Sequence, residues 1–84
     1  MSEEIKKNII NGKQCRAARA LLYISQDELE KKSNVAKKTI ADFERENRTP
    51  QTRTLRDIQR TFEEAGVEFE TSERGFGIRL ITKK

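Results

Sequence analysis

Residues 25–50 read SQDELEKKSNVAKKTIADFERENRTP, and this stretch predicts two short helices joined by a tight turn. Ser25 is a typical N-cap residue, and Glu28 follows it at the spacing of a capping box. The first helix is expected to end near Ser33. Asn34 then stands where the chain must turn, because asparagine tolerates a left-handed backbone better than most residues.

The second helix of the pair is expected to begin at Ala36 or Lys37 and to bury Ile40 and Phe43. Residues 47–50, NRTP, are expected to end it and form a loop, because proline disfavours helical backbone in the residue before it. The opening turn carries lysines, so the helix is predicted to have one apolar and one basic face.

A helix on each side completes a bundle. Asn11 is expected to cap a helix over 12–22, whose buried stripe is Cys15, Ala18, Leu21 and Leu22. Thr52 is expected to cap a further helix over 53–65, with Leu55, Ile58, Phe62 and Ala65 on one face. Gly66 is well placed to stop that helix.

After Gly66 the apolar period changes from that of a helix to that of a strand, which predicts a hairpin over 67–71 and 76–82. Its alternating apolar residues are Val67, Phe69, Phe76, Ile78 and Leu80, and we expect the phenylalanines here and at Phe62 to be core residues. The predicted fold is mostly α, with four to five short helices and a C-terminal β-hairpin. Residues 1–10 are expected to form an N-terminal arm.

Composition favours a small core and a polyanionic partner. Of 84 residues, 33% are hydrophobic and 38% charged, so burial against a second copy would add stability. The net charge is +4, and residues 11–50 hold most of it, with nine Lys/Arg against six Asp/Glu. A local basic excess suits nucleic acid, although charged runs are more often solvated faces.

Several function classes are disfavoured. Cys15 is the only cysteine and histidine is absent, so one chain cannot assemble a disulfide, a Cys/His zinc site or a Cys/His catalytic pair. Cys15 falls on the apolar stripe and is interpreted as a buried hydrophobe. We therefore predict no enzymatic activity, metal or cofactor. No apolar run is long enough to span a membrane, and no signal peptide is evident, so we expect a cytoplasmic protein.

Residues 11–66 resemble the Xre/Cro/phage-repressor-type helix-turn-helix family, in particular its small stand-alone bacterial members. The resemblance rests on four pieces in order: QCRAARALL (14–22), SQDEL (25–29), NVAKKTIADFE (34–44) and RTP (48–50). It implies a lambda-repressor-like bundle over 11–66 that binds double-stranded DNA, with the second helix of the pair in the major groove.

The resemblance also implies roles for individual residues. Lys37 and Lys38 match base-reading positions, and Asp42 matches a position that sometimes reaches a base. The positions implied to contact the DNA backbone are Gln26, Thr39, Arg45, Asn47 and Arg48. Arg19 and Glu44 match an internal salt bridge between the first helix and the recognition helix. Ala36 departs from the family's Ser or Thr, which removes a side-chain cap worth about 1 kcal/mol.

The expected function is that of a sequence-specific transcriptional regulator, a repressor that binds an inverted repeat as a homodimer. Residues 67–84 are expected to pair the two copies, through Phe69, Ile78, Leu80 and Ile81. The alternative is a protein-interaction module, such as an autoregulating antitoxin whose hairpin binds a small toxin.

Overall fold

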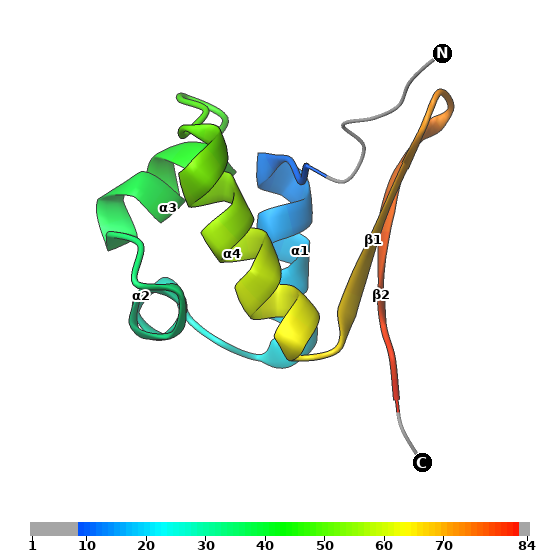
Figure 1. Cartoon of the computed structure of the whole chain (residues 1–84), viewed down its shortest axis with the longest axis horizontal. Coiled ribbons are helices and arrows are strands. Elements are labelled where there is room, and N and C mark those ends of the chain that lie inside the picture. Colours follow the sequence, from blue (N-terminus) through cyan, green and yellow to red (C-terminus); the bar gives the residue numbers. More distant parts are fainter. Residues whose placement is uncertain (1–8, 83–84) are drawn as a thin grey trace.

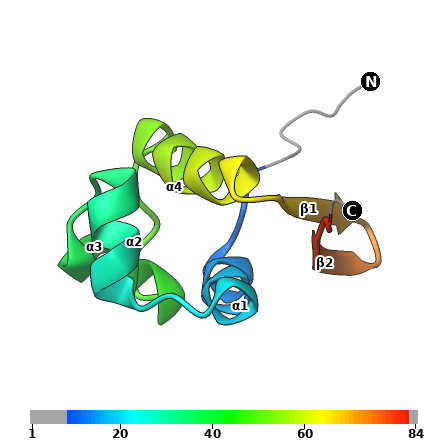
Figure 2. The same ribbon diagram turned by 90° about the horizontal axis from the view of Figure 1, so that it is seen from below.

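The computed structural model describes residues 9–82, which form four helices followed by a two-stranded antiparallel hairpin (Figure 1). The elements are α1 (Gly12–Leu22), α2 (Gln26–Ser33), α3 (Lys37–Glu44), α4 (Thr52–Glu64), β1 (Val67–Ser72) and β2 (Gly75–Leu80). This arrangement confirms the predicted fold class. Helices α1 and α4 lie between the α2–α3 pair and the hairpin, as the view from below shows (Figure 2).

Helix α1 is fixed at both ends by local hydrogen bonds. The Asn11 side chain accepts from the Gln14 amide, and the Gln14 side chain accepts from the Asn11 amide, which makes a capping box. At the other end Tyr23 adopts a left-handed conformation with φ 58°, and the Ile24 amide donates to the Arg19 carbonyl. This is a Schellman-type stop, so α1 ends at Leu22 as expected.

Helix α1 packs against the end of α3 through Gly12. A Cβ atom on Gly12 would overlap the carbonyl oxygen of Phe43 and press on the backbone of Glu44. Backbone atoms cannot rotate away as a flexible side chain can. Glycine at this position is therefore required by the close approach of two helices rather than by its own backbone angles.

In residues 25–50, the N-terminus of α2 and the turn between α2 and α3 form as the sequence predicts. Ser25 and Glu28 make the predicted capping box, and Asn34 is left-handed with φ 64°. No side chain caps α3 at Ala36. The helix ends at Glu44, earlier than the NRTP loop suggested, because Glu46 takes a left-handed conformation with φ 63°.

Helix α4 begins one residue earlier than predicted. Thr52 is its first residue and not its cap. Gln51 holds the N-cap position, and no side chain there bonds to the helix amides. At the far end Gly66 has φ 98°, which a residue with a side chain rarely adopts, so the glycine stop is confirmed.

The hairpin pairs Val67 with Leu80, Phe69 with Ile78, and Thr71 with Phe76, all on the face turned toward the helices. The strands run Val67–Ser72 and Gly75–Leu80, so Ile81 lies just beyond β2. Its amide donates to the Gly66 carbonyl at 2.7 Å, which closes the base of the hairpin.

One core holds the helices and the base of the hairpin together. Its buried apolar residues are Ile10, Cys15, Ala18, Leu29, Val35, Ile40, Phe43, Leu55, Ile58, Phe62 and Val67, and Leu22, Ile24, Phe69, Ile78 and Leu80 pack against it half-buried. Phe62 and Phe69 meet edge to face, with ring centroids 6.0 Å apart. The hairpin is therefore packed on the bundle.

Three residues expected on buried faces are exposed: Leu21, Ala65 and Phe76. Ala65 lies one residue beyond the last turn of α4, at its C-cap, and is not covered there. Leu21 lies outside the buried face of α1 because it follows Cys15 by two steps of three residues. Each such step falls about 60° short of a full helical turn, so the second step turns the side chain toward solvent. Phe76 is 49% exposed because the tip of the hairpin projects beyond the helices (Figure 1). The three predictions were wrong because burial here depends on the position of each residue in the fold and not on its hydrophobicity alone.

A buried glutamine joins the hairpin to α1. The Gln14 side chain is almost fully buried, and its Nε2 donates to the carbonyl oxygens of Glu70 and Gly77 at 3.2 and 3.1 Å. Glu70 and Gly77 are cross-strand partners. One side chain thus caps α1 and holds both strands against it.

Most of the expected N-terminal arm lies outside the described residues. Within them, Ile9 and Ile10 are not helical, and Ile10 is buried with its amide donating to Gln59 Oε1 at 3.1 Å. Of the helices in the described part of the chain, none combines the length and apolar character needed to cross a membrane.

Candidate nucleic-acid interface

The outer face of α3 carries the candidate base-reading residues. Ile40 is fully buried and Phe43 is 4% exposed, so this side of the helix faces the core. Lys37 and Lys38 begin the helix with side chains 51% and 86% exposed. The helix therefore has the apolar and basic faces that the sequence predicts.

Both lysines are paired with carboxylates. Lys37 Nζ lies 3.1 Å from Asp27 Oδ1 of α2, and Lys38 Nζ lies 3.8 Å from Asp42 Oδ2 one turn along α3. Asp42 Oδ1 also accepts from Arg45 Nη2 at 3.1 Å. Asp42 is thus held between two cations, with its side chain only 18% exposed.

The loop after α3 comes back beside the start of that helix. A shallow cleft of about 470 Å³ is lined by Lys38, Thr39 and Asp42 of α3, by Arg48, Thr49, Pro50 and Gln51 of the loop, and by Thr54 of α4. The cleft brings together four of the expected DNA-contacting residues, Lys38, Thr39, Asp42 and Arg48, whereas Lys37, Gln26, Arg45 and Asn47 are not part of its lining. Arg45, Asn47 and Arg48 are exposed on the chain that borders it.

Behind this surface, Glu44 anchors α3 to α1 and α2. Arg19 donates from Nε to Glu44 Oε2 at 2.8 Å and from Nη2 to Oε1 at 2.7 Å, so the ion pair that the resemblance implies is present. Gln26 Nε2 donates to Glu44 Oε1 at 3.1 Å, and Cys15 Sγ lies 3.2 Å from Oε2. An amide nitrogen carries two N–H groups, so Nε2 of Gln26 has a second donor besides the one on Glu44.

The electrostatics of this cluster follow from its burial. Burial by itself would raise the pKa of Glu44, but hydrogen bonds from Arg19, Cys15 and Gln26 outweigh it and hold that pKa below its usual value. The bond to Glu44 raises the pKa of Arg19 above its usual value. Burial, then the Glu44 charge, raises the pKa of the Cys15 thiol, which keeps the sulfur protonated.

Two features of the surface were not predicted from the sequence. Asp27 reaches Lys37 across the turn between two helices, and Lys13 of α1 pairs with Glu46 at 2.9 Å. Both pairs join elements that only the tertiary fold brings together. The capping pattern of Ser25 and Glu28 places Asp27 in the first turn of α2. It does not indicate that Lys37 is the partner of Asp27.

The family comparison agrees with this geometry. A helix-turn-helix family model matches residues 16–69, more than half of the chain, from within α1 to within β1. The chain belongs to the Xre/Cro/CI-type helix-turn-helix family. Members of this helix-turn-helix family are DNA-binding regulators, and α2 and α3 are the helix-turn-helix pair of this member. No curated protein matches the chain.

Proposed function

We propose that the protein is a sequence-specific transcriptional regulator that acts as a repressor in the cytoplasm, without enzymatic activity. The observation that carries the proposal is the single surface formed by the opening turn of α3 and the loop that carries Arg48. An α-helix fits the major groove, where each base pair has a distinct set of donors and acceptors. Exposed cations at the start of such a helix are the expected readers.

In this proposal Lys37 and Lys38 read base edges, and Asp42 orients Lys38 or accepts from a base. The contacts to the DNA backbone come from Gln26, Thr39, Arg45, Asn47 and Arg48. The Arg19–Glu44 pair keeps α3 at a fixed angle to α1 and supports recognition without touching DNA. Two copies bind the two halves of an inverted repeat, since one module buries too little surface for tight specific binding.

We propose that the second copy pairs through the hairpin, which lies on the side of the bundle away from α3 (Figure 2). Among residues 9–82 the sheet has two strands, so each strand has an edge that no described strand covers. Two β1 edges paired about Phe69 would place Glu68 opposite Glu70 of the second copy, which is unfavourable. Two β2 edges paired about Ile78 would place Arg79 opposite Gly77.

The β2 edge is therefore the better dimer contact. Phe69, Ile78 and Leu80 already pack half-buried on the core of one chain, so they support the strand from beneath. Phe76 within β2, 49% exposed, and Ile81 just beyond it, 42% exposed, can add apolar contact between copies.

The proposed dimer is tested by two variants that each introduce one lysine near the tip of the hairpin, one on β2 and one on β1. Thr71 and Phe76 are cross-strand partners on the same face, one on each strand, and both are exposed. Sedimentation equilibrium of the full chain should show that Phe76→Lys weakens the dimer, because a lysine on a paired edge opposes strand addition. Thr71→Lys, which adds the same charge on β1, should leave it unchanged. A monomeric parent chain, or equal effects of both variants, would reject the β2 contact.

Specific DNA binding is tested by selection from a random duplex pool at near-physiological salt. The proposal predicts an enriched inverted repeat with half-sites about one helical turn apart. An enriched single half-site would support sequence-specific binding and would reject binding as a dimer. Salt-sensitive binding without enrichment would reject sequence-specific recognition.

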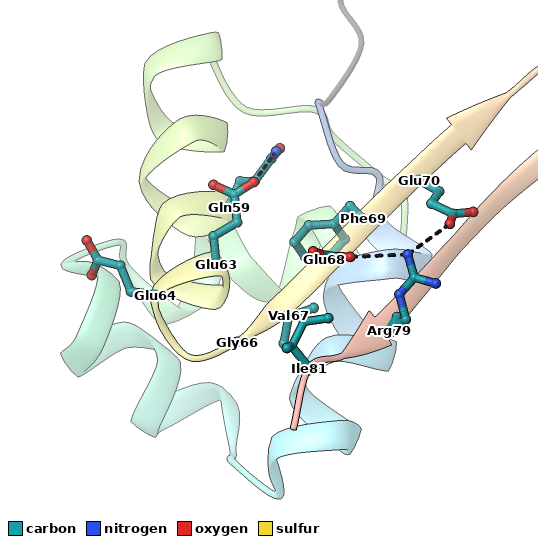
Figure 3. A pocket seen from close by; sticks show the side chains of 10 residues that line it. All are labelled: Gln59, Glu63, Glu64, Gly66, Val67, Glu68, Phe69, Glu70, Arg79 and Ile81. Carbon is teal, nitrogen blue, oxygen red and sulfur yellow. Dashed lines mark hydrogen bonds and ion pairs between the residues drawn. The ribbon is translucent and has the colours of Figure 1, made fainter. Parts of the chain in front are cut away.

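A second candidate function is favoured by an acidic groove of about 730 Å³ between α4 and β1 (Figure 3). Its lining includes the carboxylates of Glu63, Glu64, Glu68 and Glu70, and Arg79 lies 3.1 and 3.3 Å from Glu68 and Glu70. An acidic groove beside a strand edge suits a basic extended segment of a partner protein. An autoregulating antitoxin would use such a groove for its toxin.

The second function is tested by co-purification from the native host. A small protein that co-purifies with the parent chain, and is lost with Glu70→Lys but not with Glu30→Lys, would support it. Recovery of the parent chain alone would leave DNA regulation as the sole function.

A further inference from the structure

We infer that Asp27 is a specificity-determining residue of the DNA-binding surface. Its carboxylate engages the Lys37 ammonium group so that this lysine favours a neutral base edge over an anionic phosphate. The inference rests on the proposed function of Lys37 as a base reader. It assigns to α2 a part in sequence discrimination besides contact with the DNA backbone.

The position of Asp27 is determined by the first turn of α2. Asp27 follows Gln26, the first residue of that helix, where a negative charge interacts favourably with the free amide groups. From there Oδ1 lies 3.1 Å from Nζ of Lys37, the first residue of α3. The two side chains are 64% and 51% exposed, so both are accessible to DNA.

Lys37 has a reason to stay near Asp27 in the unbound protein. It lies at the amino end of α3, where free amide groups give the helix a partial positive charge. No side chain caps that end, since Ala36 holds the N-cap position. A lysine there is repelled by its own helix and attracted by the carboxylate of the neighbouring one.

The pair can discriminate because an ammonium group has three donors. With one N–H on Asp27, the other two can reach O6 and N7 of a guanine, which are neutral acceptors. A phosphate that approaches the same ammonium group also meets the Asp27 carboxylate and is repelled by it. The pair therefore weakens binding to arbitrary duplexes more than binding to a site with the right base.

The expected effect is modest because the pair is exposed and screened by salt. Replacing Asp27 by Asn should lower the ratio of specific to non-specific affinity about two- to five-fold, the range that an exposed ion pair can supply. The loss should come mainly from tighter non-specific binding. It should be larger at low salt, where the repulsion of phosphate is stronger.

The test compares Asp27→Asn with Glu64→Gln, which makes the same change in net charge at the end of α4. Dissociation constants are measured by fluorescence anisotropy on the duplex that the selection enriches and on a scrambled duplex of the same length. A lower ratio for Asp27→Asn than for Glu64→Gln supports the inference. Equal ratios for the two variants would overturn it.

A second comparison separates this role from a structural one. In a Lys37→Gln background, Asp27→Asn should change the ratio no more than Glu64→Gln does, because the lysine that Asp27 acts on is gone. A further drop there would show that Asp27 acts by another route and would overturn the inference. If the selection enriches no sequence at all, the failure belongs to the proposed function and not to Asp27.

Discussion

Glu44, the last residue of α3, accepts two hydrogen bonds from the Arg19 guanidinium of α1, at 2.8 and 2.7 Å. The carboxylate is 3% exposed and the guanidinium side chain 19% exposed, so the pair is largely removed from water. An ion pair in the interior thus joins the last residue of α3 to α1. Removing one partner of such a pair leaves a charge without compensation.

We therefore expect Glu44→Gln to destabilise the fold by about 3 kcal/mol, the usual cost of breaking a buried ion pair. Urea unfolding followed by circular dichroism measures the change. Glu46→Gln is the matched control, since the Lys13–Glu46 pair is about half exposed on both sides and should contribute under about 1 kcal/mol. Similar losses in the two variants would contradict the role given to Glu44.

The same pair predicts a pH dependence. Because the pKa of Glu44 is lowered in the folded chain, its stabilisation is complete above the unfolded-state pKa of about 4.3 and is lost as the pH falls through the folded pKa. The stability difference between the parent and Glu44→Gln should be constant near neutral pH and should shrink as the pH falls below the unfolded-state pKa. Urea unfolding at a series of pH values measures it. A difference that does not change with pH would mean that the carboxylate charge is not what stabilises α3.

Gly12→Ala should destabilise the protein by about 3 kcal/mol, the upper part of the usual range for overpacking, because its methyl group would overlap the Phe43 carbonyl. Thermal unfolding reports the loss. Gly77→Ala is the control, since a Cβ there meets nothing within 4 Å. It should change the stability by no more than about 0.5 kcal/mol. An unaffected Gly12→Ala protein would mean that α1 and α3 can separate freely.

Gln14→Leu should cost about 2–3 kcal/mol, because it removes the α1 capping box and two hydrogen bonds to the hairpin. Amide hydrogen exchange should show the larger loss of protection in β1 and β2. Gln51→Leu replaces an exposed glutamine that makes no capping bond, so its effect should be within about 0.5 kcal/mol. Unchanged exchange in the hairpin of Gln14→Leu would show that strand packing does not need the glutamine.

Lys37→Ala and Arg48→Ala should affect DNA binding in different ways, the first through base preference and the second through salt dependence. Lys37→Ala should cost about 1–3 kcal/mol on the selected site and relax its base preference. Arg48→Ala should weaken all duplexes similarly and reduce the slope of log affinity against log salt by about one. Anisotropy titrations at several salt concentrations measure both quantities. An unchanged slope for Arg48→Ala would count against its contact with phosphate.

Much of the fold could be predicted because its signals are local. The capping box at Ser25 and Glu28, the turn at Asn34 and the stop at Gly66 each depend on residues a few positions apart. Apolar spacing likewise identified Ile40 and Phe43 as the buried face of α3. These features could be predicted because they need no knowledge of what the helix packs against.

The missed features depend on contacts distant in sequence. Gln14 donates to carbonyls 56 and 63 residues away, and no local pattern distinguishes it from a solvated glutamine. The exposed position of Phe76 depends on where the helices stop beneath the hairpin. Of the candidate interface, the resemblance supplied the positions on α3 and its loop, but Asp27 became visible only when α2 and α3 were placed side by side.

The buried thiol of Cys15 gives this chain a reporter of its own opening. The sulfur is inaccessible at the contact of α1 with Glu44, and its raised pKa leaves little thiolate to react with an alkylating reagent. A reagent can reach it only in molecules whose helices have come apart. Since the chain has no other cysteine, the rate of labelling follows the fraction of open molecules, and DNA that holds the bundle closed would slow it.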